Sequence, residues 1–243
     1  MGETTMQLTR TALALTAGAL APALLLATPA LATAAPAKTS VTAPASATPG
    51  SDTENAAAIA KILADPASGK GVIRAANAAL SGTPEDRVAF LTTGFAKAQD
   101  EDNKVAILRI LAGKPGKGVT REINKALDGT PADRVAFLAT GLAKAQDEDN
   151  KVAILRILHT NPATGKGVER EANKALDGTP ADRTAFLKTG LRLAQAEDDR
   201  VDVVRILARP GISDALYAEC QRLLNGSTPE ELRYFITVGQ YQF

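Results

Sequence analysis

The sequence predicts an all-α protein, a solenoid-like helical repeat array with three helices in each unit of 47–49 residues. The segment Ala126–Leu138 recurs almost unchanged at residues 79–91 and 175–187, and a degenerate copy occupies residues 223–236. One phenylalanine marks each copy, at intervals of 47, 49 and 49 residues: Phe90, Phe137, Phe186 and Phe235. Such periods are typical of helical units that stack on their neighbours and bury a continuous core.

A Thr-Pro pair predicts where the first helix of each unit begins. Thr130 is placed to cap a helix whose first residue is Pro131 and whose third is Asp133. This arrangement satisfies free amide groups and suits the helix dipole. Apolar residues follow at helical spacing, so we expect the helix to run to about Gln146. The other copies begin in the same way at Thr83, Thr179 and Thr228.

An acidic break and a Gly-rich break predict the other two helices. We expect the second helix to begin at residues 147–150, which read Asp-Glu-Asp-Asn, and to be the most buried one. Its apolar residues lie on most sides: Val152, Ile154, Leu155, Ile157 and Leu158. The third helix is expected at about Lys166–Leu176, after Pro162 and Gly165, with Gly178 just beyond its end.

Every repeated phenylalanine is followed four residues later by a glycine, as in Phe137 and Gly141. Glycine inside a helix costs about 1 kcal/mol relative to alanine, so its recurrence needs a physical reason. We expect a neighbouring helix to cross closely at this position. Replacement of Gly141 by alanine is then predicted to destabilise the fold by overpacking.

The N-terminus has the composition of an export leader. No charged residue occurs from Thr11 to Ala37, and the apolar stretch ends in small residues, so residues 1–32 are predicted to be a secretory signal peptide. A retained membrane anchor is the alternative, because the apolar run is about long enough to span a bilayer. Met6 is an alternative start, since Glu3 is unusual in a basic leader.

The rest of the chain divides into a spacer and a repeat domain. Residues 33–51 form an Ala/Pro/Ser/Thr tract with few bulky apolar side chains, and we predict a disordered spacer there. The repeat domain is expected to cover residues 52–243. Its parts are a half unit at 52–81, units at about 82–128, 129–177 and 178–225, and a partial unit at 226–243. Partial units at both ends are typical of caps.

The composition excludes several classes of function. The chain has 28 basic and 27 acidic side chains, and a net charge of +1 provides no electrostatic footprint for nucleic acid. Aromatic residues make up 4% of the chain, too few for base-stacking platforms. One Cys and one His supply neither a disulfide framework nor an ordinary zinc ligand set. No cofactor is expected, and no integral membrane association after the leader is cleaved.

Three Gly-Lys-Gly turns precede the third helices but lack the spacing of a phosphate-binding loop. Each lysine is followed four residues later by an arginine, and stacked units would align these pairs as a basic ridge: Lys70, Arg74, Lys117, Arg121, Lys166 and Arg170. At helix N-termini, such a ridge is a candidate site for an acidic envelope polymer. The alternative is a solvated surface on which Glu122, Glu169 and Glu171 offset the charge. Asp214 replaces the lysine in the last copy.

The remaining reactive side chains are interpreted as structural. The acidic clusters at 100–102, 147–149 and 197–199 lack the calcium-loop pattern, and helix capping explains them more simply than metal binding. Cys220 aligns with Ala172 and is predicted to be a small core residue, whereas His159 is predicted to face solvent. Neither has a recurring partner of the kind that nucleophilic or acid–base catalysis requires, so no catalytic, cofactor or metal site is predicted.

The segment Ala-Leu-Asp-Gly-Thr-Pro-Ala-Asp-Arg-Val-Ala-Phe-Leu at residues 126–138 resembles the ALF repeats, short units marked by alanine, leucine and phenylalanine in secreted bacterial proteins. The resemblance covers most of residues 55–243. It implies export, all-helical repeats and no established activity, with a role in signalling suggested, and it carries over no catalytic residues. The last copy departs from the pattern at Tyr234 and Ile236.

Together these observations predict an exported, non-catalytic protein that presents an interaction surface, with signalling at the cell envelope as the role that the resemblance suggests. The partner is expected to be a protein or an acidic envelope polymer. A passive structural or spacer module of a secreted repeat protein is the alternative. An enzyme is the least favoured class, because little of the repeat domain is unrepeated.

Overall fold

A computed structural model describes residues 50–160 and 165–243, which form helices joined by short turns, without a strand. The predicted leader at 1–32 and spacer residues 33–49 lie outside these ranges. No helix within them is long and apolar enough to cross a membrane. The all-α repeat fold predicted from the sequence is confirmed for the repeat domain.

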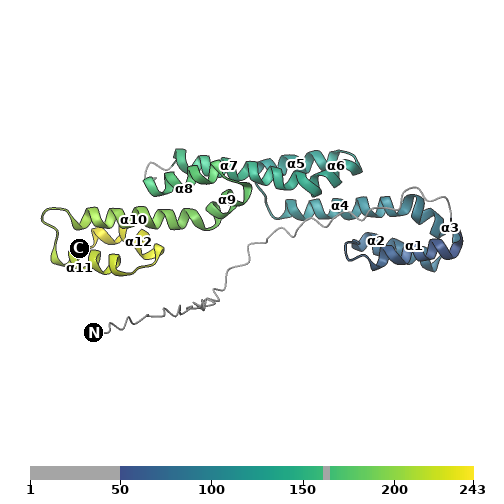
Figure 1. Cartoon of the computed structure of the whole chain (residues 1–243), viewed down its shortest axis with the longest axis horizontal. Helices are drawn as coiled ribbons and strands as arrows, with labels where there is room; N and C mark the ends of the chain where they lie inside the picture. Colours follow the sequence, from purple (N-terminus) through teal and green to yellow (C-terminus); the bar gives the residue numbers. More distant parts are fainter. Residues whose placement is uncertain (1–49, 161–164) are drawn as a thin grey trace, which may run out of the picture. The chain divides into compact units, whose positions relative to one another are not determined.

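The helices recur in a fixed order (Figure 1). Each complete unit contains three α-helices and one π turn. The half unit contains α1 (Asp52–Ala64) and α2 (Lys70–Ser81). The next unit contains α3 (Pro84–Ala89), π turn η1 (Phe90–Gly94), α4 (Phe95–Ala112) and α5 (Lys117–Asp128). Its successor contains α6 (Pro131–Ala136), η2 (Phe137–Gly141), α7 (Leu142–Thr160) and α8 (Lys166–Asp177).

The same pattern continues to the last described residues. There the elements are α9 (Pro180–Ala185), η3 (Phe186–Gly190), α10 (Leu191–Leu207), α11 (Asp214–Asn225) and α12 (Pro229–Thr237), with a final 3-10 turn η4 (Gly239–Tyr241). The third helix of the unit was predicted at about Lys166–Leu176, and α8 confirms it to within one residue.

The first two helices of a unit form one continuous helix. α6 passes through η2 into α7, and Phe137 and Leu142 at the two junctions keep right-handed helical dihedral angles. Residues 147–150 lie inside α7, so the predicted helix start at this acidic segment is wrong. We call these continuous segments, at 84–112, 131–160 and 180–207, the long helices. The short helices are α2, α5, α8 and α11.

Each long helix begins at its Thr-Pro pair, as predicted. Thr130 Oγ1 accepts a hydrogen bond from Asp133 N at 3.3 Å, and Asp133 Oδ2 accepts one from Thr130 N at 2.7 Å. This reciprocal capping box fixes the start of the helix because it satisfies two otherwise free amide groups. Thr83, Thr179 and Thr228 make the same box.

A π turn follows at the repeated phenylalanine. Leu142 N donates to Phe137 O five residues earlier, and Thr140 Oγ1 donates to Ala136 O at 3.4 Å, so a side chain supplements the rearranged main-chain bonds. A Cβ atom at Gly141 would lie 3.2 Å from Phe137 Cδ2. The close neighbour of the repeated glycine is therefore the phenylalanine ring of its own helix, and the expected crossing helix is wrong.

The core is divided into four clusters and is not the continuous core expected from the repeat period. Each cluster joins the C-terminal half of one long helix, a short helix and the N-terminal half of the next long helix, with α1 and α12 as the outermost halves. In one cluster, Ile107 of α4, Ile123 of α5 and Phe137 of η2 are 0%, 0% and 5% exposed. Each long helix thus belongs to two clusters and connects them.

The C-terminal half of a long helix is only partly buried. Ile154 is fully buried, but Val152 and Leu155 are 54% and 53% exposed, so the prediction of burial on most sides is wrong for these two positions. The short helix behaves as expected, with Val168 and Ala172 fully buried. The apolar residues of the long helix therefore lie partly in the core and partly on the exposed surface.

Gly141→Ala is expected to lower the free energy of unfolding by about 1 kcal/mol. The added methyl group would press on the buried Phe137 ring, and this overpacking outweighs the gain in helix propensity. Denaturant unfolding measures the change. In a Phe137→Leu background the same replacement should become neutral or stabilising, whereas an undiminished loss there would contradict the ring contact.

Candidate functional site

An open groove recurs where the middle of one long helix meets the first turns of the next. The grooves between α1 and α3, α7 and α9, and α10 and α12 have volumes of about 320, 510 and 360 Å³. The nine residues that line the α7–α9 groove and the nine that line the α10–α12 groove occupy equivalent positions, 49 residues apart. We call these the inter-unit grooves. As recurring concave surfaces they are the candidate functional site.

An arginine–aspartate pair holds together the two long helices of a groove. Arg183 of α9 donates from Nε and Nη2 to the Asp147 carboxylate of α7, at 2.6 and 2.9 Å. Its Nη1 donates to the carbonyls of Ala175, Leu176 and Gly178 at the C-terminal end of α8. The hydrogen bond from Arg183 lowers the pKa of Asp147. Three helices thus meet at one guanidinium, and the pairs Arg87–Asp52 and Arg134–Asp100 repeat the contact.

The third residue of the acidic segment caps a different helix. Asp149 of α7 accepts from Gly118 N at 2.8 Å and Val119 N at 3.0 Å, at the N-terminus of α5. A Cβ atom at Gly116 or Gly118 would lie 2.3 or 2.8 Å from this carboxylate, which explains the Gly-Lys-Gly sequence. The capping role predicted for the acidic clusters is correct in kind, but the capped helix is the preceding short helix. Asp102 and Asp198 repeat the contact.

The residues of the predicted basic ridge are exposed at the N-terminal ends of α2, α5 and α8: Lys70, Arg74, Lys117, Arg121, Lys166 and Arg170. Two amide groups at each of these ends are bonded to the capping aspartate and are not available to an anion. Arg121 pairs with Glu122 at 3.1 Å, and Arg170 pairs with Glu171 and Glu197 at 3.0 and 2.9 Å. Anion binding by the ridge stays a prediction, and these ion pairs offset part of its positive charge.

The last groove replaces the arginine–aspartate pair by an apolar contact. Ala196 stands at the position of Asp147 and Leu232 at the position of Arg183, and they are 2% and 0% exposed in the same cluster. The carbonyl end of the short helix finds another donor, because Ser227 Oγ donates to Leu223 O at 2.8 Å. The two changes are matched, since either alone would bury an unpaired charge.

A charged pair occurs instead at neighbouring positions of the same two helices. Asp199 and Arg233 replace Asn150 and Thr184, whose side chains share a 3.1 Å hydrogen bond in the preceding groove. Arg233 Nη2 lies 2.8 Å from Asp199 Oδ1, while Asp199 Oδ2 accepts no hydrogen bond from the described residues. Burial raises the pKa of Asp199, which is 1% exposed, although Arg233 acts in the opposite direction. The carboxylate charge is therefore incompletely compensated.

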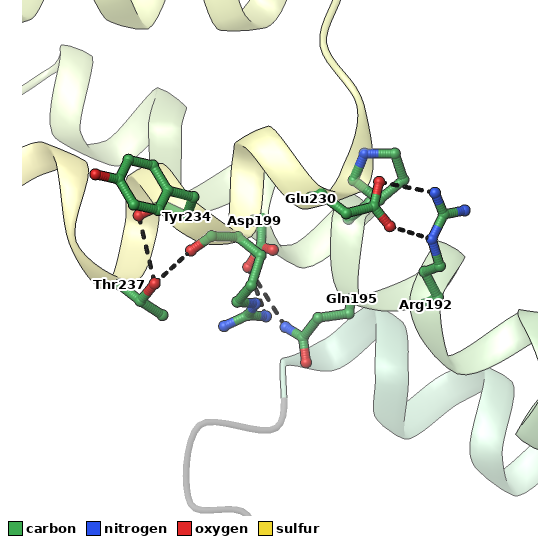
Figure 2. Close-up of a pocket in the computed structure, with 9 residues that line it drawn as sticks. Arg192, Gln195, Asp199, Glu230, Tyr234 and Thr237 are labelled. Carbon is green, nitrogen blue, oxygen red and sulfur yellow. Dashed lines mark hydrogen bonds and ion pairs between the residues drawn. The ribbon is translucent and has the colours of Figure 1, made fainter.

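The last groove, shown in Figure 2, differs in chemistry from the equivalent α7–α9 groove. Arg192 and Glu230 form a bidentate pair at its rim, with Nη2 2.8 Å from Oε2. Tyr234 is 56% exposed, and Thr237 Oγ1 donates to the carbonyls of Arg233 and Tyr234. In the α7–α9 groove the positions of Arg192, Glu230, Tyr234 and Thr237 hold Ala143, Ala181, Ala185 and Lys188. The helices that form the groove thus repeat, while the side chains that line it change.

The reactive side chains outside the grooves stand apart from one another. Cys220 of α11 is fully buried in the core, as predicted, and burial raises the pKa of its thiol. His159 is exposed near the end of α7, as predicted. In the ranges that the structure covers, no three His, Cys, Asp or Glu residues are grouped so that they would hold a metal ion.

Sequence reasoning identified the acidic segments and the Thr-Pro-x-Asp-Arg motif but missed that they meet. The residues are 34–36 positions apart, so no local pattern connects them. The available signal was their joint loss in the last copy, where Ala196 and Leu232 replace the aspartate and the arginine together. The joint appearance of a new charged pair in the same copy, Asp199 and Arg233, was a second signal of this kind.

A family model of ALF repeats, described as short repeats of unknown function, matches residues 50–98, 104–145 and 151–194, more than half of the chain. The resemblance read from the repeated segment is thereby confirmed. The matched ranges end before Ala196, Asp199, Leu232 and Arg233 of the last groove. No curated protein matches the chain.

Arg134→Ala is expected to lower the midpoint of thermal unfolding by roughly 5–10 °C. The change leaves Asp100 without its bidentate partner and removes the donor to three carbonyls at the end of α5. The double variant Arg134→Leu with Asp100→Ala copies Leu232 and Ala196 and should recover most of the loss. Circular dichroism melting tests both, and an unchanged midpoint in Arg134→Ala would contradict the assigned role.

Asp147 and Asp199 are predicted to change the stability of the fold with pH in opposite directions. Because the fold lowers the pKa of Asp147 from 3.8, its contribution is present above that value and is lost as pH falls through the folded pKa. Because the fold raises the pKa of Asp199 from 3.8, its charged form opposes folding above the folded pKa, and this penalty vanishes below 3.8.

Variants separate these two contributions. Asp199→Asn with Arg233→Thr copies the neutral pair of the preceding groove and should raise the free energy of unfolding near pH 7, but change it little near pH 3. Asp147→Asn should lower it near pH 7. Denaturant unfolding at the two pH values gives the comparison, and a double variant less stable than the parent near pH 7 would refute the sign derived for Asp199.

Proposed function

Because the chain belongs to the ALF family of short repeats, whose function is unknown, we propose that it is an exported, non-catalytic helical-repeat protein. It presents the inter-unit grooves as an interaction surface to a partner at the cell envelope, where it takes part in signalling. The proposal goes beyond the family, and it combines the export leader expected at residues 1–32 with the surface of the repeat domain.

The observation that carries the proposal is the recurrence of one groove with a changing lining. The long helices and capping residues keep the groove in place, while positions such as Ala181 and Glu230, or Ala185 and Tyr234, differ between equivalent grooves. Repeat proteins use such surfaces to bind extended partners, because a constant frame places variable side chains at regular intervals. Specificity then resides in the lining.

The charged side chains near the grooves support binding rather than catalysis. Asp147 and Arg183 are committed to each other and to helix ends, and the acidic segment caps the preceding short helix. General acid–base chemistry needs a group poised to exchange a proton with substrate. These groups instead hold the helices in register.

The kind of partner follows from two surfaces. The grooves suit an extended protein segment, whereas the ridge formed by Lys70, Lys117 and Lys166 with their arginines suits an acidic envelope polymer. The nearly neutral net charge of +1 argues against nucleic acid. We favour the grooves, because the ridge arginines Arg121 and Arg170 already pair with glutamates.

A passive structural or spacer module of a secreted repeat protein is the second candidate. The observation that favours it is the apolar surface beyond α12, where Val238, Tyr241 and Phe243 are 44%, 77% and 54% exposed. Such a surface suits permanent packing against another module more than reversible recognition. This candidate predicts no dependence of partner binding on the groove lining.

Affinity capture tests the proposal with the exported protein as bait and with envelope fractions and secreted proteins as prey. Ala185→Tyr fills the α7–α9 groove with the side chain found at the equivalent Tyr234, and it should reduce capture of a specific partner at least about tenfold. Asn173→Tyr is the matched control, because Asn173 is exposed on α8 and lines no described groove.

Loss of capture in both variants, or in neither, would contradict the groove and favour the spacer. Charge reversal of Lys70, Lys117 and Lys166 in the same assay tests the ridge, since undiminished capture would eliminate it. Mass spectrometry of the exported protein determines whether residues 1–32 are removed. An intact leader would place the protein at the membrane and contradict a freely exported form.

A further inference from the structure

The long helices expose the same two apolar positions in three successive units. These positions form what we call the apolar stripe: Val105 and Leu108 of α4, Val152 and Leu155 of α7, and Val201 and Val204 of α10, which are 44–54% exposed. None of these residues lines an inter-unit groove. Scattered apolar residues on a surface need no explanation, but the same pair in every unit does.

The stripe is not required by the clusters of its own chain. On the buried side of the same helices, Ile107, Ile154 and Val203 are fully buried and pack in the cores. The equivalent positions of the half unit hold only Ala57 and Ala60, so the fold forms there without large apolar side chains outside. The larger residues of the three complete units therefore point to a contact outside the chain.

The charges that flank the stripe are arranged symmetrically around its first residue. In α4 an exposed glutamate, Glu101, lies four residues before Val105, and an exposed arginine, Arg109, lies four residues after it. The other two units repeat this spacing with Glu148 and Arg156 around Val152, and Glu197 and Arg205 around Val201.

This symmetry matches an antiparallel pairing of like helices. A two-fold axis at the valine places each glutamate opposite the partner's arginine, whereas a parallel pairing places like charges together. The glutamates already contact basic residues of their own chain: Lys104, Lys151 and Arg170. These contacts are exposed and weak, so exchange for an intermolecular partner costs little.

We propose that the apolar stripe is a homotypic contact surface, on which a long helix of one copy packs antiparallel against the same stripe of a second copy. A two-fold contact of this kind uses one surface patch twice and needs no second sequence. The proposal is independent of the function assigned to the grooves, because it rests on different residues.

The size of the stripe predicts a reversible association. Two half-exposed side chains per helix bury far less than the roughly 800 Å² per partner of a standard stable interface. The pairing of one long helix alone is thus a weak contact, and measurable association requires more than one long helix of a copy to engage through its part of the apolar stripe, each adding to the effective concentration of the next. Replacement of stripe residues on all three long helices should then have a larger effect than replacement on one.

Sedimentation velocity of the full chain over a range of concentrations tests the proposal. Replacement of Val105, Val152 and Val201 by glutamate should raise the dimer dissociation constant at least about tenfold. The matched control replaces Asn77, Asn124 and Asn173 by glutamate, because these residues occupy equivalent exposed positions on the short helices. It adds the same charge elsewhere and should leave the constant within about twofold.

A charge exchange tests the antiparallel orientation. Replacement of Glu101, Glu148 and Glu197 by arginine should weaken association, and the added replacement of Arg109, Arg156 and Arg205 by glutamate should restore it. A chain that stays monomeric up to about 1 mM would overturn the proposal. So would association that survives the three valine replacements, or that is not restored by the charge exchange.

Discussion

The junctions between clusters in α4 and α7 each depend on two aspartates that lie two residues apart in the middle of the long helix. Residues at this spacing point to opposite sides of the helix, since each residue turns it by about 100°. Asp147 accordingly binds Arg183 of the following unit, whereas Asp149 caps α5 of the preceding one. The cores are separate, so hydrophobic packing alone would leave neighbouring clusters loosely connected. Two carboxylates supply the directional bonds that relate one cluster to the next.

The last cluster shows that the geometry does not require this particular chemistry. There Ala196 and Leu232 make the contact by apolar packing, which agrees with the general finding that a buried ion pair is replaceable by well-packed apolar residues. A charged pair occurs instead at neighbouring positions of the same two helices, Asp199 and Arg233. The equivalent residues of the preceding unit, Asn150 and Thr184, form a neutral hydrogen bond. A carboxylate kept at 1% exposure without full compensation serves stability poorly. It changes the chemistry of a groove whose nine lining positions are retained.

The repeat thus has two kinds of surface, which differ in how much their residues vary from unit to unit. The inter-unit grooves combine a constant frame with a variable lining, which is the arrangement expected where equivalent sites recognise different chemical groups. The apolar stripe varies little from unit to unit, which is the arrangement expected where like surfaces meet. Both follow from the long helix, which contributes one side to the cores, its middle and its first turns to the grooves, and its remaining side to solvent. The π turns at Phe90, Phe137 and Phe186 do not interrupt the long helices, so each of these helices runs through two clusters.

The sequence by itself determined the helical class, the 47–49-residue period, the capping boxes such as that of Thr130, and the burial of Cys220. These features depend on neighbouring residues or on exact repetition, and both are visible in one dimension. Only the tertiary structure decided that residues 147–150 continue a helix, that Gly141 makes room for its own phenylalanine, and that the core divides into four clusters. It also brought together Arg183 and Asp147, and with them the grooves. The reason is physical: a carboxylate caps whichever amide groups the fold brings near it, and the partners of Asp147 and Asp149 lie about 30 or more residues away in the chain.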